Sequence, residues 1–268
     1  MKKILPFTGL LLLVFGGMRA QNVFNINDPI TRYDATQPLG SLQHPDPAKP
    51  GLQKWVSTPT SGVSVGTGSI DVSSFKQYFI NYNGTRMAFR LKFPKSFTDA
   101  DSVQKIYPLM LFLHGAGEVG CPSNNGVYNN EKQLWLGGGL FRDFVDQNRF
   151  DGFLLYPQLV NNAGCWGAWG ETATANLTSL IAIIDSMAKY IRADIDRVMV
   201  NGLSGGGYGA WRMADVFPQR IAKIIPSAAA GNVNNRNDFV HIPIWFATGG
   251  KDPDPTPAQA QYSYTKMK

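Results

Sequence analysis

A serine inside a run of glycines is the residue of this chain best suited to covalent chemistry. The stretch reads VNGLSGGGYGAW over residues 200–211, so Ser204 has Gly202 two places before it and Gly206 two places after it. An apolar Val-Met-Val run precedes it, which predicts a strand–turn–helix unit with the serine at the turn. A serine held on such a turn has a strained backbone, and the chain beside it must pass without Cβ atoms. We interpret Ser204 as a nucleophile; the alternative is an incidental serine in a glycine-rich turn.

Two backbone amides are candidates for stabilising a negative charge that forms beside this serine. The first is the N–H of Gly205, at the start of the helix predicted to follow. The second is the N–H of Ala116 in the stretch LFLHGAGEVG, where Gly115 and Gly117 allow the backbone to approach closely. His114 in the same stretch is predicted to shape the loop through hydrogen bonds, in preference to the alternative that it is a catalytic base.

An aspartate in a later loop is the candidate for the acidic partner of the nucleophile. Asp252 lies in FATGGKDPDPTP, directly after a predicted strand and after Ser204 in the chain. This order, serine before acid, is one of those in which a triad can be assembled. A triad carboxylate orients the histidine and stabilises its cation. Asp254 is the competing candidate, and the alternative for both is a turn aspartate before proline.

The histidine of such a triad has no obvious candidate. The chain has three histidines, His44, His114 and His241, and none of them follows Asp252. His241 precedes a predicted strand and should lie at the opposite edge of the sheet, while His44 could reach Ser204 only if its segment folded over the site. We therefore expect a C-terminally truncated sequence that lacks the last helix, the last strand and the histidine loop. This chain is expected to be poorly active or inactive, because a serine without its base loses most of its rate enhancement.

Alternating strands and helices are predicted to position these residues. The segment FKQYFINYNGTRMAFRLKF has two alternating stretches joined by Asn83-Gly84, a strong hairpin signal. The later elements are apolar runs at 107–115, 150–158, 198–202, 221–229 and 242–250, and helices at 176–191 and from Gly205 towards Val216. This order predicts an α/β fold: a mostly parallel sheet with an antiparallel start and helices on both faces. Its working residues should follow the carboxyl ends of the strands.

The domain boundaries follow from composition. Of the 268 residues, 44% are hydrophobic and 16% are charged, which is typical of a globular protein. Residues 1–20 have a basic start, an apolar core and Ala20 before the implied cut, which predicts a secretory signal peptide. A membrane anchor or a core helix is the alternative. Residues 21–70 are predicted to form an irregular lead-in and residues 71–268 an α/β domain. We expect a secreted or periplasmic protein with no membrane association after cleavage.

The net charge limits the classes of binding partner that we expect, and the cysteine content limits the possible disulfides. The formal net charge is +6, and removal of the three cations in residues 1–20 leaves +3 with no Lys/Arg cluster, so neither nucleic acid nor an anionic membrane surface is expected as a partner. Cys121 and Cys165 are the only cysteines. They lie on loops predicted to share one face, so they could form one disulfide in an exported protein; two free buried thiols are the alternative.

The stretches LFLHGAGEVG, DIDRVMVNGLSGGGYGAW and IPIWFATGGKD resemble the secreted esterases related to polyhydroxybutyrate depolymerases and to feruloyl or acetylxylan esterases. The resemblance covers roughly residues 75–257 and implies an α/β-hydrolase fold with no metal or organic cofactor. It implies cleavage of carboxylic esters through an acyl-enzyme. The triad serine corresponds to Ser204 and the aspartate to Asp252, while the histidine corresponds to no residue here. Thr248 is a departure, since relatives often have a histidine there.

The implied partner is an ester substrate, either a polyester or an acyl or feruloyl ester of a plant polysaccharide. Trp166 and Trp169 are candidates for lining a pocket for an aromatic or sugar-linked acyl group, with plain packing as the alternative. Two other functions stay open at the level of sequence. One is a serine peptidase on the same fold, and the other is a non-catalytic binding protein that lacks the triad histidine.

Overall fold

The computed structural model describes residues 22–29, 45–55, 73–100, 104–118, 134, 137–159, 166–167, 175–231, 233–234 and 236–268. The predicted signal peptide lies outside these residues, as does much of the predicted lead-in. Among the helices described, none combines the length and apolar character needed to cross a membrane.

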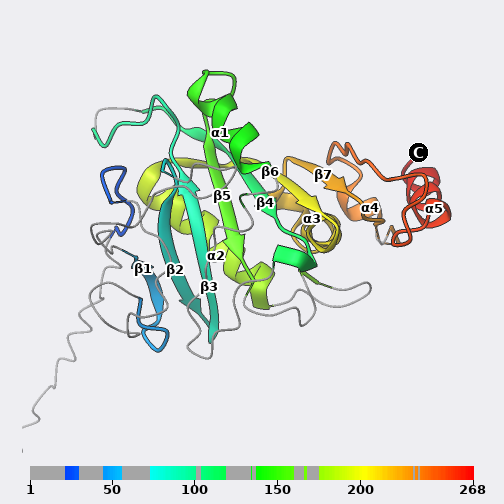
Figure 1. Cartoon of the computed structure of the whole chain (residues 1–268), viewed down its shortest axis with the longest axis horizontal. Coiled ribbons are helices and arrows are strands. Elements are labelled where there is room, and N and C mark those ends of the chain that lie inside the picture. Colours follow the sequence, from blue (N-terminus) through cyan, green and yellow to red (C-terminus); the bar gives the residue numbers. More distant parts are fainter. Residues whose placement is uncertain are drawn as a thin grey trace, which may run out of the picture.

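The described chain is built on a seven-stranded mixed sheet with the strand order β1-β2-β3-β5-β4-β6-β7 (Figure 1). The strands are β1 (Gly51–Lys54), β2 (Lys76–Tyr82), β3 (Thr85–Lys92), β4 (Tyr107–Leu113), β5 (Phe153–Gln158), β6 (Ala193–Leu203) and β7 (Lys223–Ser227). Strands β1, β2, β3 and β5 pair antiparallel in that order. Strands β5, β4, β6 and β7 pair parallel. The predicted sheet, antiparallel at its start and parallel beyond, is confirmed.

The hairpin between β2 and β3 sets the register of the antiparallel part. Asn83 and Gly84 both have left-handed backbones, with φ of 49° and 78°. A two-residue turn of this kind matches the twist of the flanking strands. It pairs Tyr82 with Thr85 and, further along, Tyr78 with Phe89. The Asn-Gly signal therefore fixes which β2 and β3 side chains face the core.

Both faces of the sheet are covered by helices. Along β4, Leu109, Leu111 and Leu113 belong to one apolar cluster, while Phe112 belongs to a second, because successive side chains of a strand point to opposite faces. The first cluster includes the apolar sides of α2 (Ala175–Ile191) and α3 (Gly205–Val216). The second includes residues of α1 (Gly138–Asp146), among them Val145. The prediction of helices on both faces is confirmed.

The segment after β7 differs from the regular strand predicted at 242–250. It is extended beside β7, but it forms only two isolated bridges, Ile224 with Ile244 and Ser227 with Ala247. Pro243 has no N–H to give to a ladder, and only β7 among the described residues flanks this segment. Two short turns of helix, η1 (Ala116–Glu118) and η3 (Pro218–Arg220), and the short helix α4 (Arg236–Phe239) complete the connections.

The sequence prediction did not include α5 (Pro257–Met267), which lies beyond β7 in Figure 1. Its start has a recognisable signal. Thr256 accepts a hydrogen bond from the Gln259 amide, the Gln259 side chain accepts one from the Thr256 amide, and a proline occupies the first turn. This reciprocal capping satisfies backbone donors that the helix itself leaves unpaired.

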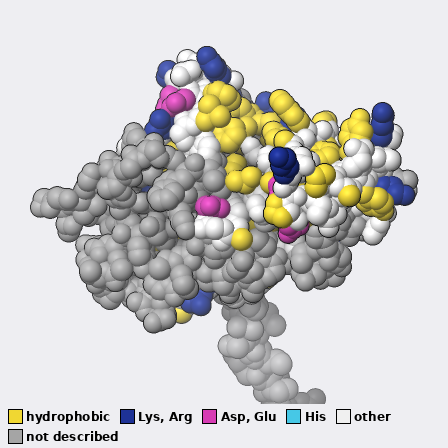
Figure 2. All heavy atoms as spheres, turned by 45° about the vertical axis from the view of Figure 1, so that its right-hand side comes forward, with side chains coloured by type: hydrophobic (Ala, Val, Ile, Leu, Met, Phe, Trp, Pro, Cys, Tyr) yellow, Lys and Arg dark blue, Asp and Glu magenta, His cyan; other side chains and the backbone are white. Residues whose placement is uncertain are grey.

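The edge of the sheet next to this extended segment carries exposed apolar side chains. Trp245 is 73% exposed and Val240 is 67% exposed. They border a groove of about 430 Å³ that also includes Trp211 and Ile244. Figure 2 shows hydrophobic side chains scattered among basic ones on the face where the right-hand side of Figure 1 comes forward. Helix α5 forms one side of this groove, through Tyr264 and Met267.

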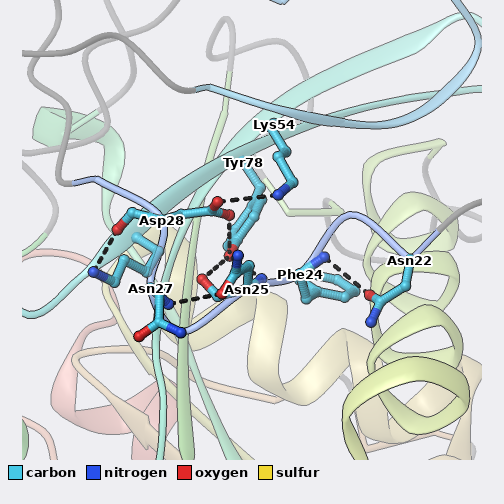
Figure 3. Close-up of polar contacts among 8 residues, drawn as sticks. Asn22, Phe24, Asn25, Asn27, Asp28, Lys54 and Tyr78 are labelled. Carbon is cyan, nitrogen blue, oxygen red and sulfur yellow. Dashed lines mark hydrogen bonds and ion pairs between the residues drawn. The ribbon is translucent and has the colours of Figure 1, made fainter. Parts of the chain in front are cut away.

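The lead-in is more ordered than predicted, since it contains strand β1 and an anchored segment before it. Phe24 is buried and packs edge-on against Tyr78, with the ring centres 5.1 Å apart. Asp28 is also buried; its carboxylate pairs with the Lys54 ammonium at 3.0 Å and accepts a hydrogen bond from the Tyr78 hydroxyl at 3.3 Å (Figure 3). Burial raises the pKa of Tyr78 above its ordinary value, so the phenol stays protonated. One aromatic ring and one carboxylate thus fix residues 22–28 to the sheet.

We expect Phe24→Ala to lower the free energy of unfolding by about 3–5 kcal/mol, because it empties a buried aromatic site against Tyr78. Urea unfolding followed by circular dichroism measures this. Asn27→Ala is the matched control in the same segment, since Asn27 is exposed, and it should change the value by less than about 0.5 kcal/mol. Equal effects of the two substitutions would contradict the anchoring role of Phe24.

Candidate active site

Ser204 lies at the sharp turn between β6 and α3. Its φ is 54° and its ψ is −120°, a backbone conformation that residues with a Cβ rarely adopt. The surrounding structure holds it there: the Ser204 amide donates to the Ser227 carbonyl at 2.8 Å, and its own carbonyl accepts from the Tyr208 amide at 3.0 Å. The predicted strand–turn–helix position of this serine is therefore what the structure shows, and the strain is of the kind stored at functional sites.

The glycines on either side of Ser204 are required by close backbone contacts. A Cβ on Gly202 would lie 2.0 Å from the Gly206 carbonyl oxygen. A Cβ on Gly206 would lie 1.9 Å from the Leu113 carbonyl oxygen, at the end of β4. Both distances are far below any real contact of a Cβ. The G-x-S-x-G spacing thus allows the first turn of α3 to pack directly on β6 and β4.

The loop after β4 reaches the serine from the other side. A Cβ on Gly115 would lie 3.4 Å from the Ser204 Cβ and 3.2 Å from the Leu203 carbonyl oxygen. The next residue, Ala116, is exposed, and its amide donates to no described acceptor. The Gly205 amide begins α3, where the first N–H groups have no partner within the helix. The two predicted oxyanion donors are therefore on segments that flank Ser204; their role stays a prediction.

His114 is fully buried and forms part of the support of this loop. Its Nδ1 lies 2.7 Å from the Gly115 carbonyl oxygen, and its Nε2 accepts a hydrogen bond from the Leu159 amide at 3.0 Å. These partners assign the proton to Nδ1 and leave the ring neutral. Burial lowers the pKa of His114 to about 4, with the Gly115 carbonyl acting in the opposite direction. Since both ring nitrogens are occupied, these bonds fit the predicted loop-shaping role.

Trp166 was predicted as a candidate for a substrate pocket, and the structure corrects this. Its side chain is fully buried, its indole N–H donates to the His114 carbonyl oxygen at 2.9 Å, and its ring lies edge-on to the imidazole at 5.2 Å. A Cβ on Gly209 of α3 would lie 2.3 Å from the Trp166 Cβ. Trp166 therefore packs between the loop after β4 and helix α3. Trp169, its predicted partner, lies outside the described residues.

Two side chains at this loop were not singled out by the sequence analysis. The Gln158 side-chain Nε2, at the end of β5, donates to the Glu118 carbonyl oxygen at 2.6 Å and so ties the loop to the sheet. The Glu118 carboxylate folds back over the loop: a Cβ on Gly115 would lie 3.1 Å from its Oε2. The same point lies 3.4 Å from the Ser204 Cβ, so the Glu118 carboxylate and Ser204 border the same side of Gly115. The sequence signal that could have identified Glu118 is its position as an acidic residue two places after the Gly115-Ala116 pair.

The acid loop separates the roles of its two aspartates. Asp254 is exposed and accepts a hydrogen bond from the Tyr208 hydroxyl at 2.9 Å, which connects the loop to the first turn of α3. Asp252 is half-buried; its Oδ1 accepts from the Asp254 amide at 3.2 Å, and its Oδ2 has no described partner. This arrangement favours Asp252 as the carboxylate free to orient a histidine, as the sequence predicted. A cavity of about 610 Å³, lined by Tyr208, Asp254, Gln259 and Tyr262, opens beside this loop.

No described histidine is placed to act as the base. His114 is held as above, and His241 is exposed with its Nε2 3.3 Å from the Pro218 carbonyl oxygen. His44 lies outside the described residues, as do Cys121 and Cys165, so the predicted disulfide stays a prediction. Among the residues that the structure describes, no group of three or more His, Cys, Asp or Glu side chains is arranged to hold a metal ion.

No protein-family model matches the sequence, and neither does any curated protein. Among solved structures, a thermostable esterase is 26% identical with a TM-score of 0.62, over 73% of this chain. The chain has the α/β-hydrolase fold. It spans only about half of that esterase, 52% of its length.

Two other solved structures show weaker similarity. A poly(3-hydroxybutyrate) depolymerase from Bordetella parapertussis is 11% identical with a TM-score of 0.49, over 72% of this chain and 76% of its own. A ferulic acid esterase is 16% identical with a TM-score of 0.45, over 72% of this chain and 70% of its own. At these levels of identity and similarity neither adds to the assignment of a function.

We expect Gly206→Ala to lower the free energy of unfolding by about 3 kcal/mol or more, because the added methyl overlaps the Leu113 carbonyl. The overlap cannot be relieved by a rotamer change, since the Leu113 atom is part of the backbone. Gly117→Ala is the matched control in the facing loop, since nothing lies within 4 Å of a Cβ there. Chemical denaturation of both variants tests this. If Gly206→Ala were as stable as Gly117→Ala, the close packing of α3 on β4 would be wrong.

We expect the stability of the protein to fall as the pH is lowered from about 6.5 towards 4. Buried His114 resists protonation in the folded state, so the unfolded chain binds more protons in this window, at a maximum slope of about 1.4 kcal/mol per pH unit. Above pH 6.5 the contribution is fully present. His114→Gln, which removes the titrating group, should flatten this part of the profile, measured by urea unfolding at a series of pH values. An unchanged slope in the variant would contradict the neutral, buried imidazole.

Proposed function

We propose that this chain carries the nucleophile, oxyanion donors and acid of a secreted serine esterase that cleaves carboxylic esters through an acyl-enzyme. One observation carries the proposal: a serine held at φ 54° at the start of α3, with the Gly115–Gly117 loop packed against it. Packing alone does not explain a strained serine here, because a glycine would adopt the same backbone conformation without strain. The partial identity to a thermostable esterase supports the same reaction class.

In the proposed reaction, the Ser204 oxygen attacks the ester carbonyl carbon while a histidine takes the hydroxyl proton. The carbonyl oxygen becomes an oxyanion and accepts hydrogen bonds from the Ala116 and Gly205 amides, which are fixed in advance by the loop and the helix. The tetrahedral intermediate collapses, and the histidine returns its proton to the leaving alcohol. Water then attacks the acyl-enzyme by the same route and releases the acid. Asp252 orients the histidine and stabilises its cation.

The proposed substrates are polyesters or acyl and feruloyl esters of plant polysaccharides. The cavity beside the acid loop supports a substrate with both apolar and hydroxylated parts. Tyr208 and Tyr262 offer aromatic surface, while Asp254 and Gln259 offer hydrogen-bonding groups. Tyr208 is one turn of helix after Ser204, so the cavity adjoins the first turn of α3. The proposed location outside the cell depends on the signal peptide at residues 1–20, with cleavage after Ala20.

The reaction also needs a histidine, which none of the described residues supplies. Two sources are compatible with the proposal: His44, in the part of the lead-in that the structure does not describe, or a residue encoded after Lys268. A non-catalytic binding protein is the second candidate function, and the observation that favours it is this lack of a described base. The two functions differ in whether the translated gene provides a histidine that reaches Ser204.

We expect the product of the whole reading frame, with any residues encoded after Lys268, to hydrolyse p-nitrophenyl acetate and methyl ferulate. Ser204→Ala should lower kcat/KM by about 10³-fold or more, because it removes the nucleophile. Asp252→Asn should lower kcat by about 10⁴-fold, as expected when the orienting carboxylate is lost, whereas Asp254→Asn keeps an acceptor for Tyr208 and should have a small effect. Steady-state kinetics on both esters measures these changes.

Further variants locate the base and separate the rival functions. His44→Ala tests the first source, and substitution of each histidine encoded after Lys268 tests the second. Cleavage of a peptide p-nitroanilide with no cleavage of the esters would replace the esterase by a peptidase. An inert, folded protein whose inactivity is shared by Ser204→Ala would favour the binding protein.

A further inference from the structure

The asparagines near the start of the described chain line a polar cavity that the proposed reaction does not use. Its volume is about 400 Å³, and its polar lining includes Asn22, Asn25, Asn27, Lys54, Asp99 and Arg192, with Tyr190 beside them. Phe24 and Phe97 form part of its wall. The residues come from four separate stretches of chain that the fold brings together: the anchored segment 22–28, the end of β1, the loop after β3 and the end of α2.

This cavity lies at the edge of the sheet opposite to Ser204. Arg192 directly precedes β6, and its carbonyl accepts from the amide of Tyr107, the first residue of β4. Ser204 follows the other end of β6, and the oxyanion loop follows the other end of β4. Six residue steps along β4 separate the two edges, about 20 Å. The cavity is therefore distinct from the candidate active site.

Two of the three asparagine side chains are held by hydrogen bonds, and all three have hydrogen-bond donors to spare. The Asn22 Oδ1 accepts from the Phe24 amide at 3.0 Å, and the Asn25 Oδ1 accepts from the Asn27 amide at 2.8 Å. Their side-chain nitrogens donate to no described residue, and the Asn27 carboxamide has no described partner at either atom (Figure 3). A carboxamide nitrogen has two N–H donors, and a carboxamide oxygen is an acceptor. Together with the exposed Asp99 carboxylate, these groups suit a ligand that can both accept and donate hydrogen bonds.

The charges around the cavity nearly cancel. Lys54 pairs with the buried Asp28 at 3.0 Å. The Arg192 guanidinium donates to the Ala100 carbonyl at 3.3 Å and lies 5.0 Å from the centre of the Phe97 ring. Asp99 is part of the same lining. Lys76 also reaches this group, since its Nζ donates to the Asp28 carbonyl oxygen at 2.5 Å. Three cations and two carboxylates leave a net charge of +1, so the uncharged carboxamides offer most of the free hydrogen-bonding groups, and these suit a neutral ligand with many hydroxyl groups.

We infer that this cavity is a binding site for a neutral saccharide, separate from the catalytic serine. Each sugar hydroxyl is one donor and two acceptors, which matches the mixture of carboxamides, ammonium and carboxylate in the lining. The segment that presents the asparagines is held by Phe24 and Asp28, so little conformational entropy is lost on binding. The inference concerns binding alone and does not depend on hydrolysis at Ser204.

The test is calorimetric titration of Ser204→Ala protein with xylohexaose and cellohexaose, in which no turnover can occur. Binding of at least one of them is expected. Asn27→Ala removes an unpartnered carboxamide and should weaken binding about three- to tenfold, the loss of one or two neutral hydrogen bonds. Asn22→Asp keeps the oxygen that accepts from the Phe24 amide but removes the N–H donors, and it should weaken binding similarly.

Gln147→Ala is the matched control, because it removes an exposed carboxamide at the end of α1 on the other face of the sheet. It should leave affinity unchanged, and near-ultraviolet circular dichroism should show all three variants folded. Inorganic phosphate and polygalacturonate are the anionic probes. The inference is overturned if neither hexasaccharide binds, if the asparagine variants bind as tightly as the control, or if only the anionic probes bind. Loss of esterase activity with saccharide binding intact would instead reject the proposed function alone.

Discussion

The contact between the first turn of α3 and the end of β4 is the constraint on which the site depends. No side chain fits between them, since a Cβ on Gly206 would lie 1.9 Å from the Leu113 carbonyl oxygen. This closeness lets β6 turn directly into α3, and the turn forces Ser204 into its left-handed backbone. It also places the start of the helix, with its unpaired amides, beside the loop that leaves β4. One packing contact therefore sets the geometry of Ser204, of the Gly205 amide and of the loop after β4 together.

A buried polar network supports the other half of the site. His114 holds the loop after β4 from within, through the Gly115 carbonyl and the Leu159 amide, and Trp166 secures the His114 backbone. Gln158 adds a bond to the Glu118 carbonyl. Buried polar groups are costly unless they are satisfied, and such networks fix one conformation of a loop. His114 thus has a structural role in the loop that packs against Ser204, because its neutral ring makes hydrogen bonds through both nitrogens.

Local signals of the sequence were sufficient for the scaffold and for the position of Ser204 at the turn before α3. The Asn83-Gly84 turn, the apolar run of β4 and the periodicity of α2 each depend on a few neighbouring residues, and each lies where predicted. The spacing of glycines around Ser204 reflects contacts within one turn, so it too could be interpreted without a structure. Helix α5 was missed although Thr256 and Gln259 form a capping box, because its apolar pattern is weak.

Contacts between distant segments could not be predicted. Trp166 lies 52 residues from His114, and its sequence surroundings gave no sign that its N–H would be buried against a carbonyl. The bond between Tyr208 and Asp254, which favours Asp252 as the acid, joins residues 46 apart. The segment at 242–250 has the apolar character of a strand, but a regular ladder also depends on its neighbours and on Pro243. Such pairings are decided by tertiary packing, which local propensity does not encode.

The most direct test of the account is to treat the product of the whole reading frame with a p-nitrophenyl alkylphosphonate and to identify the modified residue by mass spectrometry. This reagent traps an activated serine as a stable analogue of the tetrahedral intermediate. The account predicts a single adduct on Ser204, and none on the Ser204→Ala variant. No adduct on a folded protein, or an adduct at another residue, would contradict the assignment of Ser204 as the nucleophile.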